Sequence, residues 1–337
     1  MESNLAAYLE PARAGEATAP LKFFLNEYAA RPELALNTRA FYSFLIEGYL
    51  QRLGAKPLID VKAADVEHAL AAAADKPRTA QALWKLLDGV FKRAIRKDLI
   101  KPNPAQQVDA PTYRRKDKTR AFTITELTFI LEAARGNPYE ALLILALETG
   151  MRPAELYALR RADLNLADAE LWVRRDVIAN KATGFRPVVT STTKTKRTRR
   201  IKLSAVAVAA LREHLKRSWS SEFVFTSGEG HLIRHSNLIR RWWKPLLSAA
   251  KTEAEKAARA AGDADYEFPT ALGLYALRHT SDEVAALAGV DYDLISARMG
   301  HTSLTTTFKH YLNVSQERER QAAEQIGTFI EGLRKHG

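Results

Sequence analysis

The sequence predicts a mainly α-helical protein with two domains, an all-helical N-terminal domain and a mixed α/β domain with a small antiparallel sheet. The length of 337 residues favours two domains. Apolar residues recur at a spacing of three to four over most of the chain, which is typical of helices packed on a core. Between residues 169 and 204 the spacing changes towards two, which indicates strands.

The N-terminal domain is predicted to span residues 17–110, after a short tail at residues 1–16. Thr38 and the pair Lys76-Pro77 mark helix starts or breaks. Asn103-Pro104 is expected to end the last helix, because a residue before proline avoids the α region. The expected helices cover residues 20–30, 38–53, 63–75 and 78–100.

Residues 111–121 are predicted to be a linker, because the segment PTYRRKDKTR is polar, strongly basic and begins with proline. A basic linker between two domains can lie along a phosphate backbone. A solvated tether is an equally good interpretation of the same residues.

The second domain is predicted to span residues 122–337. Thr123-Ile-Thr-Glu126 has the pattern of a capping box, and the next two helices meet at Gly150, with Pro153 at a favourable early position. The helices are followed by strands at residues 169–175, 185–192 and 197–204 with turns between them, and then by helices at 205–218 and 235–251 and further helical segments up to a C-terminal helix at 315–335. Residues 251–265 are expected to form an exposed helix and loop.

The composition favours a polyanionic partner, because 51 Lys and Arg face 39 Asp and Glu, a formal charge of +12. A soluble protein with a basic surface would have the same balance. Cysteine is absent, which excludes disulfides and thiolate metal sites. Without a secretory signal or a long apolar run, the chain is expected to be cytoplasmic, associated with the nucleoid and not with a membrane.

Five short motifs supply side chains suited to chemistry on a phosphate. Each motif alone is weak, since a lone arginine, histidine or tyrosine is more often a packed or surface residue. The basic run is predicted to lie on a hairpin between the second and third strands, and alternation would point Lys194 and Lys196 to one face. The motifs are Gly150-Met-Arg152, the run Lys194–Lys202 with six basic residues in nine, Tyr275-Ala-Leu-Arg278, Gly300-His301, and His310-Tyr311.

Together these side chains suit phosphoryl transfer without a metal or a nucleotide cofactor. Two guanidiniums can neutralise the non-bridging oxygens of a phosphodiester, and a tyrosine can attack phosphorus to form a covalent intermediate. A lysine can protonate the leaving oxygen. The sequence has no GxxxxGK[ST], GxSxG, HExxH or CxxC motif, so nothing in it indicates ATP hydrolysis or a zinc site.

The order and spacing of these motifs resemble the tyrosine recombinases, a family that includes the phage integrases. The similarity extends from about residue 17 onwards, and the first domain resembles the family's helical core-binding (SAM-like) domain. LETGMRPAELYALRRADLN, LRHT and MGHTSLTTTFKHY are each moderately specific, whereas their joint order is highly specific.

The resemblance implies site-specific DNA recombination, that is integration, excision or resolution, with Tyr311 as nucleophile and a 3′-phosphotyrosyl intermediate. Arg152 and Arg278 would bind the phosphate, and His301 would donate a hydrogen bond to it. Lys194 would be the general acid, with Lys196 as the second choice. Glu155 would support the region of Arg152 rather than contact DNA.

Two features depart from the family pattern. Tyr275 stands where the family usually has histidine, and a phenol is a poor base at neutral pH, so Tyr275 is expected to position the phosphate. The interval from His301 to Tyr311 is one residue longer than usual, which places His310 at the expected offset. A small helical bulge would restore the alignment, and Tyr311 is preferred as the nucleophile.

The partners implied are double-stranded DNA at a specific site, three further copies of the chain in a synaptic tetramer, and accessory factors that bend DNA or set direction. In the C-terminal helix, Ala322, Ile326, Phe329 and Leu333 lie on one stripe. This stripe is expected to pack either on a neighbouring copy or on its own domain.

Two other functions remain open from the sequence. A catalytically weak DNA-binding or architectural protein of the same fold would account for the substitution at Tyr275 and the shifted Tyr311. Such a protein would bind DNA in a salt-dependent way without forming an adduct. A type IB topoisomerase uses similar chemistry, but the compact first domain and the chain length favour the recombinase.

Overall fold

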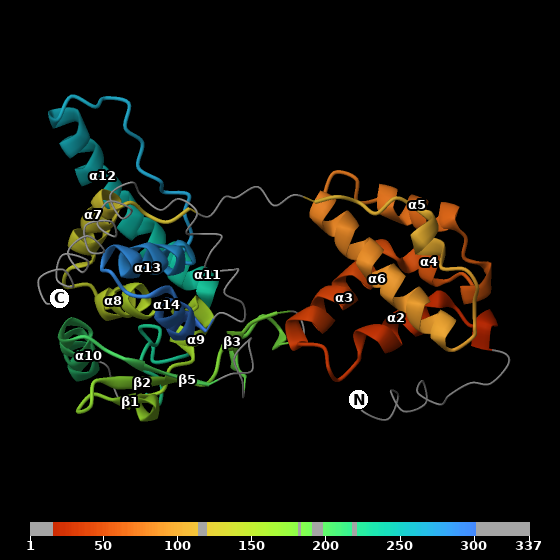
Figure 1. The fold of residues 1–337 in the computed structure, drawn as a ribbon, viewed down its shortest axis with the longest axis horizontal. Helices are drawn as coiled ribbons and strands as arrows, with labels where there is room; N and C mark the ends of the chain where they lie inside the picture. The colour runs from red at the N-terminus through yellow and green to blue at the C-terminus, as the bar shows by residue number, and fades with distance from the viewer. Residues whose placement is uncertain (1–15, 114–119, 181–182, 191–197, 218–220, 301–337) are drawn as a thin grey trace, which may run out of the picture. The chain divides into compact units, whose positions relative to one another are not determined.

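A computed structural model describes residues 16–113, 120–180, 183–190, 198–217 and 221–300 (Figure 1). The chain divides into two compact units. Met1–Lys116 forms the first unit together with Asn180–Phe185, and Asp117–Ala179 with Arg186–Gly337 forms the second. Within the described ranges, none of the helices is long and apolar enough to cross a membrane.

The first unit is a bundle of helices around one apolar core. Leu21, Leu45, Leu58, Leu87 and Phe91 are fully buried in this core. Its elements are η1 (Glu16–Thr18), α2 (Leu21–Ala29), α3 (Leu36–Tyr49), α4 (Gln51–Gly54), η2 (Leu58–Asp60), α5 (Ala63–Ala71), α6 (Pro77–Arg96) and η3 (Pro104–Gln107), where η denotes a short 3-10 turn.

Three of the predicted helices differ from those observed. The helix expected over 63–75 ends at Ala71. The segment expected as one helix over 38–53 is divided at Leu50, whose backbone leaves the helical region with φ −110° and ψ 13°. The last helix ends at Arg96 and not at Asn103-Pro104, and the chain turns through Asp98 with φ 57°. Asn103 instead begins η3, because its side chain accepts a hydrogen bond from Ala105 N at 2.9 Å.

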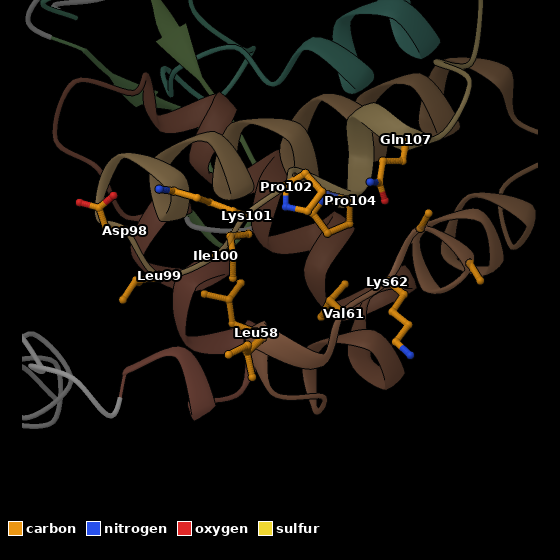
Figure 2. A pocket seen from close by; sticks show the side chains of 13 residues that line it. Leu58, Val61, Lys62, Asp98, Leu99, Ile100, Lys101, Pro102, Pro104 and Gln107 are labelled. Carbon is orange, nitrogen blue, oxygen red and sulfur yellow. The ribbon is translucent and has the colours of Figure 1, made fainter.

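A cavity of about 690 Å³ lies in this unit between the segment after α4 and the segment after α6. Figure 2 shows Leu58 and Val61 on one side and Ile100 and Pro104 on the other. None of the motif residues predicted to act on a phosphate lines this cavity.

The second unit combines helices with short strands. Its helices and turns are α7 (Ile124–Ala134), α8 (Glu140–Thr149), α9 (Pro153–Tyr157), η4 (Arg161–Asp163), α10 (Ala205–Arg217), α11 (His235–Leu238), the π-helical turn η6 (Ile239–Trp243), α12 (Lys244–Ala260), α13 (Ala276–Leu287) and α14 (Tyr292–Met299). Its strands are β1 (Leu164–Asn165), β2 (Glu170–Val173), β3 (Val177–Ile178), β4 (Val188–Val189) and β5 (Arg199–Lys202).

Helix α8 is the central element of this unit. Its sequence EALLILALET is apolar on nearly every side, as expected for a helix enclosed by neighbours. It packs between α10 and α13, while α7 packs on α12 (Figure 1). The capping box predicted at the start of α7 is confirmed, because Thr123 and Glu126 exchange hydrogen bonds between side chain and backbone.

The strand pairing differs from the prediction. The first and third predicted strands contain β2 and β5, which pair directly with Leu171 opposite Ile201. The second predicted strand contains β4, which pairs with β3 in a separate ladder. The second and third predicted strands are expected to pair as a hairpin, and this expectation is wrong because β4 and β5 belong to different ladders. Alternation in a sequence identifies strands but not their partners.

The segment predicted as an exposed helix and loop at 251–265 continues α12 as far as Ala260, and one face of it is buried at Ala254. The predicted C-terminal helix and the basic run from Lys194 to Arg197 lie outside the described residues.

Candidate active site

The candidate site contains three of the predicted catalytic side chains within the described residues. Arg152 lies at the start of α9, and Tyr275 and Arg278 lie at the start of α13. Lys194 and its alternative Lys196, and also His301 and Tyr311, lie outside the described residues.

The junction of α8 and α9 positions Arg152. Gly150 ends α8 in the left-handed conformation, with φ 59°, which glycine adopts without the steric cost of a side chain. Arg152 then precedes α9, and Pro153 occupies its first turn, as the sequence predicts. The Arg152 side chain is 18% exposed, so its guanidinium is partly open to solvent.

Glu155 binds both the backbone and the side chain of Arg152. Its carboxylate accepts the backbone N–H of Arg152 at 2.9 Å and an N–H of the Arg152 guanidinium at 3.1 Å. The Glu155 side chain is completely buried. Burial alone would raise the pKa of Glu155, but hydrogen bonds and charge from Arg199 and Arg152 outweigh it and hold the pKa below its usual value. Glu155 is therefore a buried carboxylate that stabilises Arg152, as the sequence analysis expects.

Arg278 is buried, with 3% exposure, and it joins two distant segments. One terminal nitrogen donates to the carbonyl oxygen of Gly150 and the other to that of Met299, the latter at 2.9 Å. These bonds place the guanidinium between the C-terminal ends of α8 and α14.

The charges of Arg278 and Arg152 act on one another. Burial, followed by the positive charge of Arg152, lowers the pKa of Arg278 to about 10, so the group stays protonated at neutral pH. The charges of Tyr275, Glu155 and Arg199 also influence Arg278. Two cations held close together in a partly buried setting favour an anionic ligand, and the fork of a guanidinium matches the oxygens of a phosphate.

Tyr275 immediately precedes α13, and its side chain is 40% exposed. Its ring lies edge-on to that of His279, with 5.4 Å between ring centroids. Tyr275 therefore lies at the same helix end as Arg278, three residues before it in the chain.

Sequence analysis did not single out Arg199, Asp282 or Arg298. The fork of Arg199 donates to both oxygens of Glu155, at 3.1 and 2.7 Å. Asp282 is buried one turn after Arg278 on α13, and burial raises its pKa to about 6. Arg298 donates to the carbonyl oxygens of Lys202 and Glu148 at 3.2 and 3.1 Å. The alternation of β5, which places Arg199 on the same side as buried Ile201, is the one sequence signal that could have identified Arg199.

Comparison with known proteins places this arrangement among enzymes of DNA recombination. Residues 120–318 match the model of the phage integrase family. A putative prophage phiRv2 integrase of Mycobacterium tuberculosis is 30% identical over 296 residues, which cover 87% of this chain and 74% of the relative.

Solved structures agree in fold. The Tn1549 transposon integrase in complex with transposon right end DNA superposes with a TM-score of 0.72 at 19% identity, over 91% of this chain and 99% of that one. A lambda integrase tetramer bound to a Holliday junction gives a TM-score of 0.61 at 18% identity, over 91% and 80% of the two chains.

Proposed function

The chain belongs to the phage integrase family and is a tyrosine site-specific recombinase, and we propose that it cleaves and rejoins DNA through Tyr311. The observation that supports this assignment of residues is the hydrogen bond from Arg278 to the carbonyl oxygen of Gly150, which joins the start of α13 to the turn two residues before Arg152. A pair of cations of this kind is what a phosphodiester needs before a nucleophile can attack it.

The proposed cleavage is a transesterification at phosphorus. The phenol oxygen of Tyr311 forms a bond to phosphorus and gives its proton to solvent water, while the bond from phosphorus to the 5′ oxygen breaks. Lys194, or Lys196 in its place, gives a proton to that leaving oxygen. The 3′-phosphotyrosyl bond keeps the energy of the original ester, so a 5′-hydroxyl from a second duplex can reverse the step and join new strands without ATP.

The phosphate is held by side chains with different roles. Arg152 and Arg278 neutralise the non-bridging oxygens, and His301 donates a hydrogen bond to one of them. Tyr275 contributes a hydroxyl that can donate or accept a hydrogen bond, which supports a role in positioning the phosphate rather than in removing a proton.

The partner proposed is double-stranded DNA at a specific site, bound by the N-terminal domain (17–110) and the catalytic domain (122–337), with the basic linker (111–121) along the backbone. Four copies would assemble on two sites, as in the lambda integrase tetramer on a Holliday junction. Accessory proteins would set the direction of the reaction.

A nicked suicide substrate tests the proposal. The nick lets the short strand diffuse away after cleavage, so the covalent protein–DNA adduct accumulates and is counted on a denaturing gel. The DNA duplexes tested are candidate attachment sites. They are taken from the two ends of the genetic element that carries the gene. Wild-type protein and a Tyr266→Phe control should form the adduct, and Tyr311→Phe should form none.

Two outcomes would contradict the proposal. An adduct with Tyr311→Phe would assign the nucleophile to another residue. Salt-dependent DNA binding by the wild type without any adduct would favour a DNA-binding protein without catalysis.

A further inference from the structure

Arg199 is an enclosed cation of the second unit that has no role in the proposed reaction. It begins β5, and its side chain is only 9% exposed. Its two terminal nitrogens bind Glu155, and its Nε donates to the carbonyl oxygen of Arg298 at 2.8 Å. Each nitrogen of the guanidinium is therefore bound to a segment other than its own strand.

The charge balance around Glu155 indicates a role for Arg199. The buried carboxylate carries one negative charge and lies between two arginines, Arg152 and Arg199. With Arg199 present the three groups sum to one positive charge, which Arg152 can offer to a phosphate. Without Arg199 the carboxylate would cancel the charge of Arg152 and draw its fork inward, because an unpaired buried carboxylate is costly.

Arg199 also contacts the start of the segment that contains His301. Gly300 ends α14 with φ 67°, a conformation that favours glycine, and a Cβ there would lie 3.2 Å from a terminal nitrogen of Arg199. The bond to the Arg298 carbonyl fixes the same helix end. One side chain on β5 thus binds both Glu155, which supports Arg152, and the carbonyl oxygen of Arg298 at the end of α14.

We propose that Arg199 is a positioning residue for DNA cleavage, one that neutralises Glu155 so that Arg152 keeps its charge for the scissile phosphate. The inference rests on the proposed function, and it adds a residue that contacts no DNA.

The test compares Arg199→Met with wild type and with Arg135→Met. Arg135 is also an arginine paired with a glutamate, Glu132 at 2.9 Å, but its side chain is 75% exposed and it lies outside the proposed site, so it is the surface control. The rate of adduct formation is measured at saturating DNA in single turnover, and DNA affinity is measured separately. Arg199→Met should slow cleavage about 10²-fold or more while the DNA dissociation constant changes by less than about threefold.

A second variant separates charge neutralisation from a merely structural contact. Adding Glu155→Gln to Arg199→Met removes the negative charge that Arg199 no longer balances, so cleavage should recover by about tenfold or more. A structural role alone predicts that the double variant cleaves no faster than Arg199→Met, and that result would overturn the proposal.

The remaining outcomes are equally decisive. If Arg199→Met does not fold, Arg199→Lys keeps the positive charge beside Glu155 without the fork, and it should cleave within about tenfold of the wild-type rate. A loss of about 10²-fold or more in Arg199→Lys would overturn the proposal. A wild-type chain that binds DNA but forms no adduct would refute the proposed function and this inference together. Wild-type cleavage matched by an equally fast Arg199→Met would refute the inference alone.

Discussion

The guanidinium of Arg278 donates a hydrogen bond to the carbonyl oxygen of Gly150, the residue that ends α8. This bond joins the start of α13 to the turn that leads into Arg152. The two arginines are therefore structurally coupled. The backbone turn that positions Arg152 also accepts a hydrogen bond from Arg278.

Substitution of Gly150 by alanine should disturb both arginines. Its φ of 59° disfavours a side chain, and a Cβ there would meet the Met299 side chain and lie 3.2 Å from the Ser281 hydroxyl. We expect Gly150→Ala to lower the free energy of unfolding by about 2 kcal/mol or more. Chemical denaturation measures the loss, and adduct formation should fall with it because Arg278 also binds the Met299 carbonyl.

Gly136→Ala provides the matched control for this prediction. Gly136 has a similar φ of 73°, but a Cβ there would meet nothing within 4 Å. It should cost about 1 kcal/mol, from backbone strain alone. Equal losses at the two positions would show that the contact with Met299 does not matter.

Asp282 should make stability fall as pH rises. Its folded pKa of about 6 lies above the ordinary value of 3.8, so the folded state favours the protonated carboxyl. The stability that it contributes is fully present below the unfolded pKa and is lost as pH rises through about 6, by about 3 kcal/mol in total.

Asp282→Asn removes this titration. The free energy of unfolding of the variant, relative to wild type, should therefore increase between about pH 4 and about pH 7.5. Urea denaturation at both pH values measures the difference, and Asp293→Asn on an exposed position of α14 is the control. A constant difference across this range would exclude Asp282 as the group responsible.

Glu155 should have the opposite dependence on pH. Its pKa lies below the usual value, so its stabilisation is present above the unfolded pKa and is lost as pH falls through the folded value. Glu155→Gln leaves Arg199 without its charged partner and should cost about 3 kcal/mol at neutral pH. The loss of stability in Glu155→Gln should become smaller in acid, because the wild-type carboxylate is then protonated and uncharged like the glutamine. Thermal unfolding over a pH series measures this difference. A difference that grows in acid would contradict the prediction.

DNA affinity should depend steeply on salt. Each phosphate neutralised by a lysine or arginine contributes about 0.9 to the slope of log affinity against log salt. Binding measured by fluorescence anisotropy between about 50 and about 200 mM salt should therefore weaken by orders of magnitude. An affinity that is unchanged over this range would refute the proposed contacts with the DNA backbone.

Local signals in the sequence predicted the elements that carry the site. Thr123 with Glu126, Gly150, and Pro153 mark the helix ends where the structure has them, since capping and left-handed conformations depend on residues a few positions apart. The strand partners could not be predicted in the same way. The sequence alternation of β2, β4 and β5 is compatible with more than one pairing, and long-range packing selects one of them.

The sequence by itself determined the family, and it predicted an order of reactive residues with Tyr311 as nucleophile, because these depend on residue types and their spacing. Only the tertiary structure placed a buried carboxylate, Glu155, between Arg152 and Arg199, and attached Arg278 to the ends of two helices. Burial and charge compensation involve groups far apart in the chain, and no local pattern encodes them.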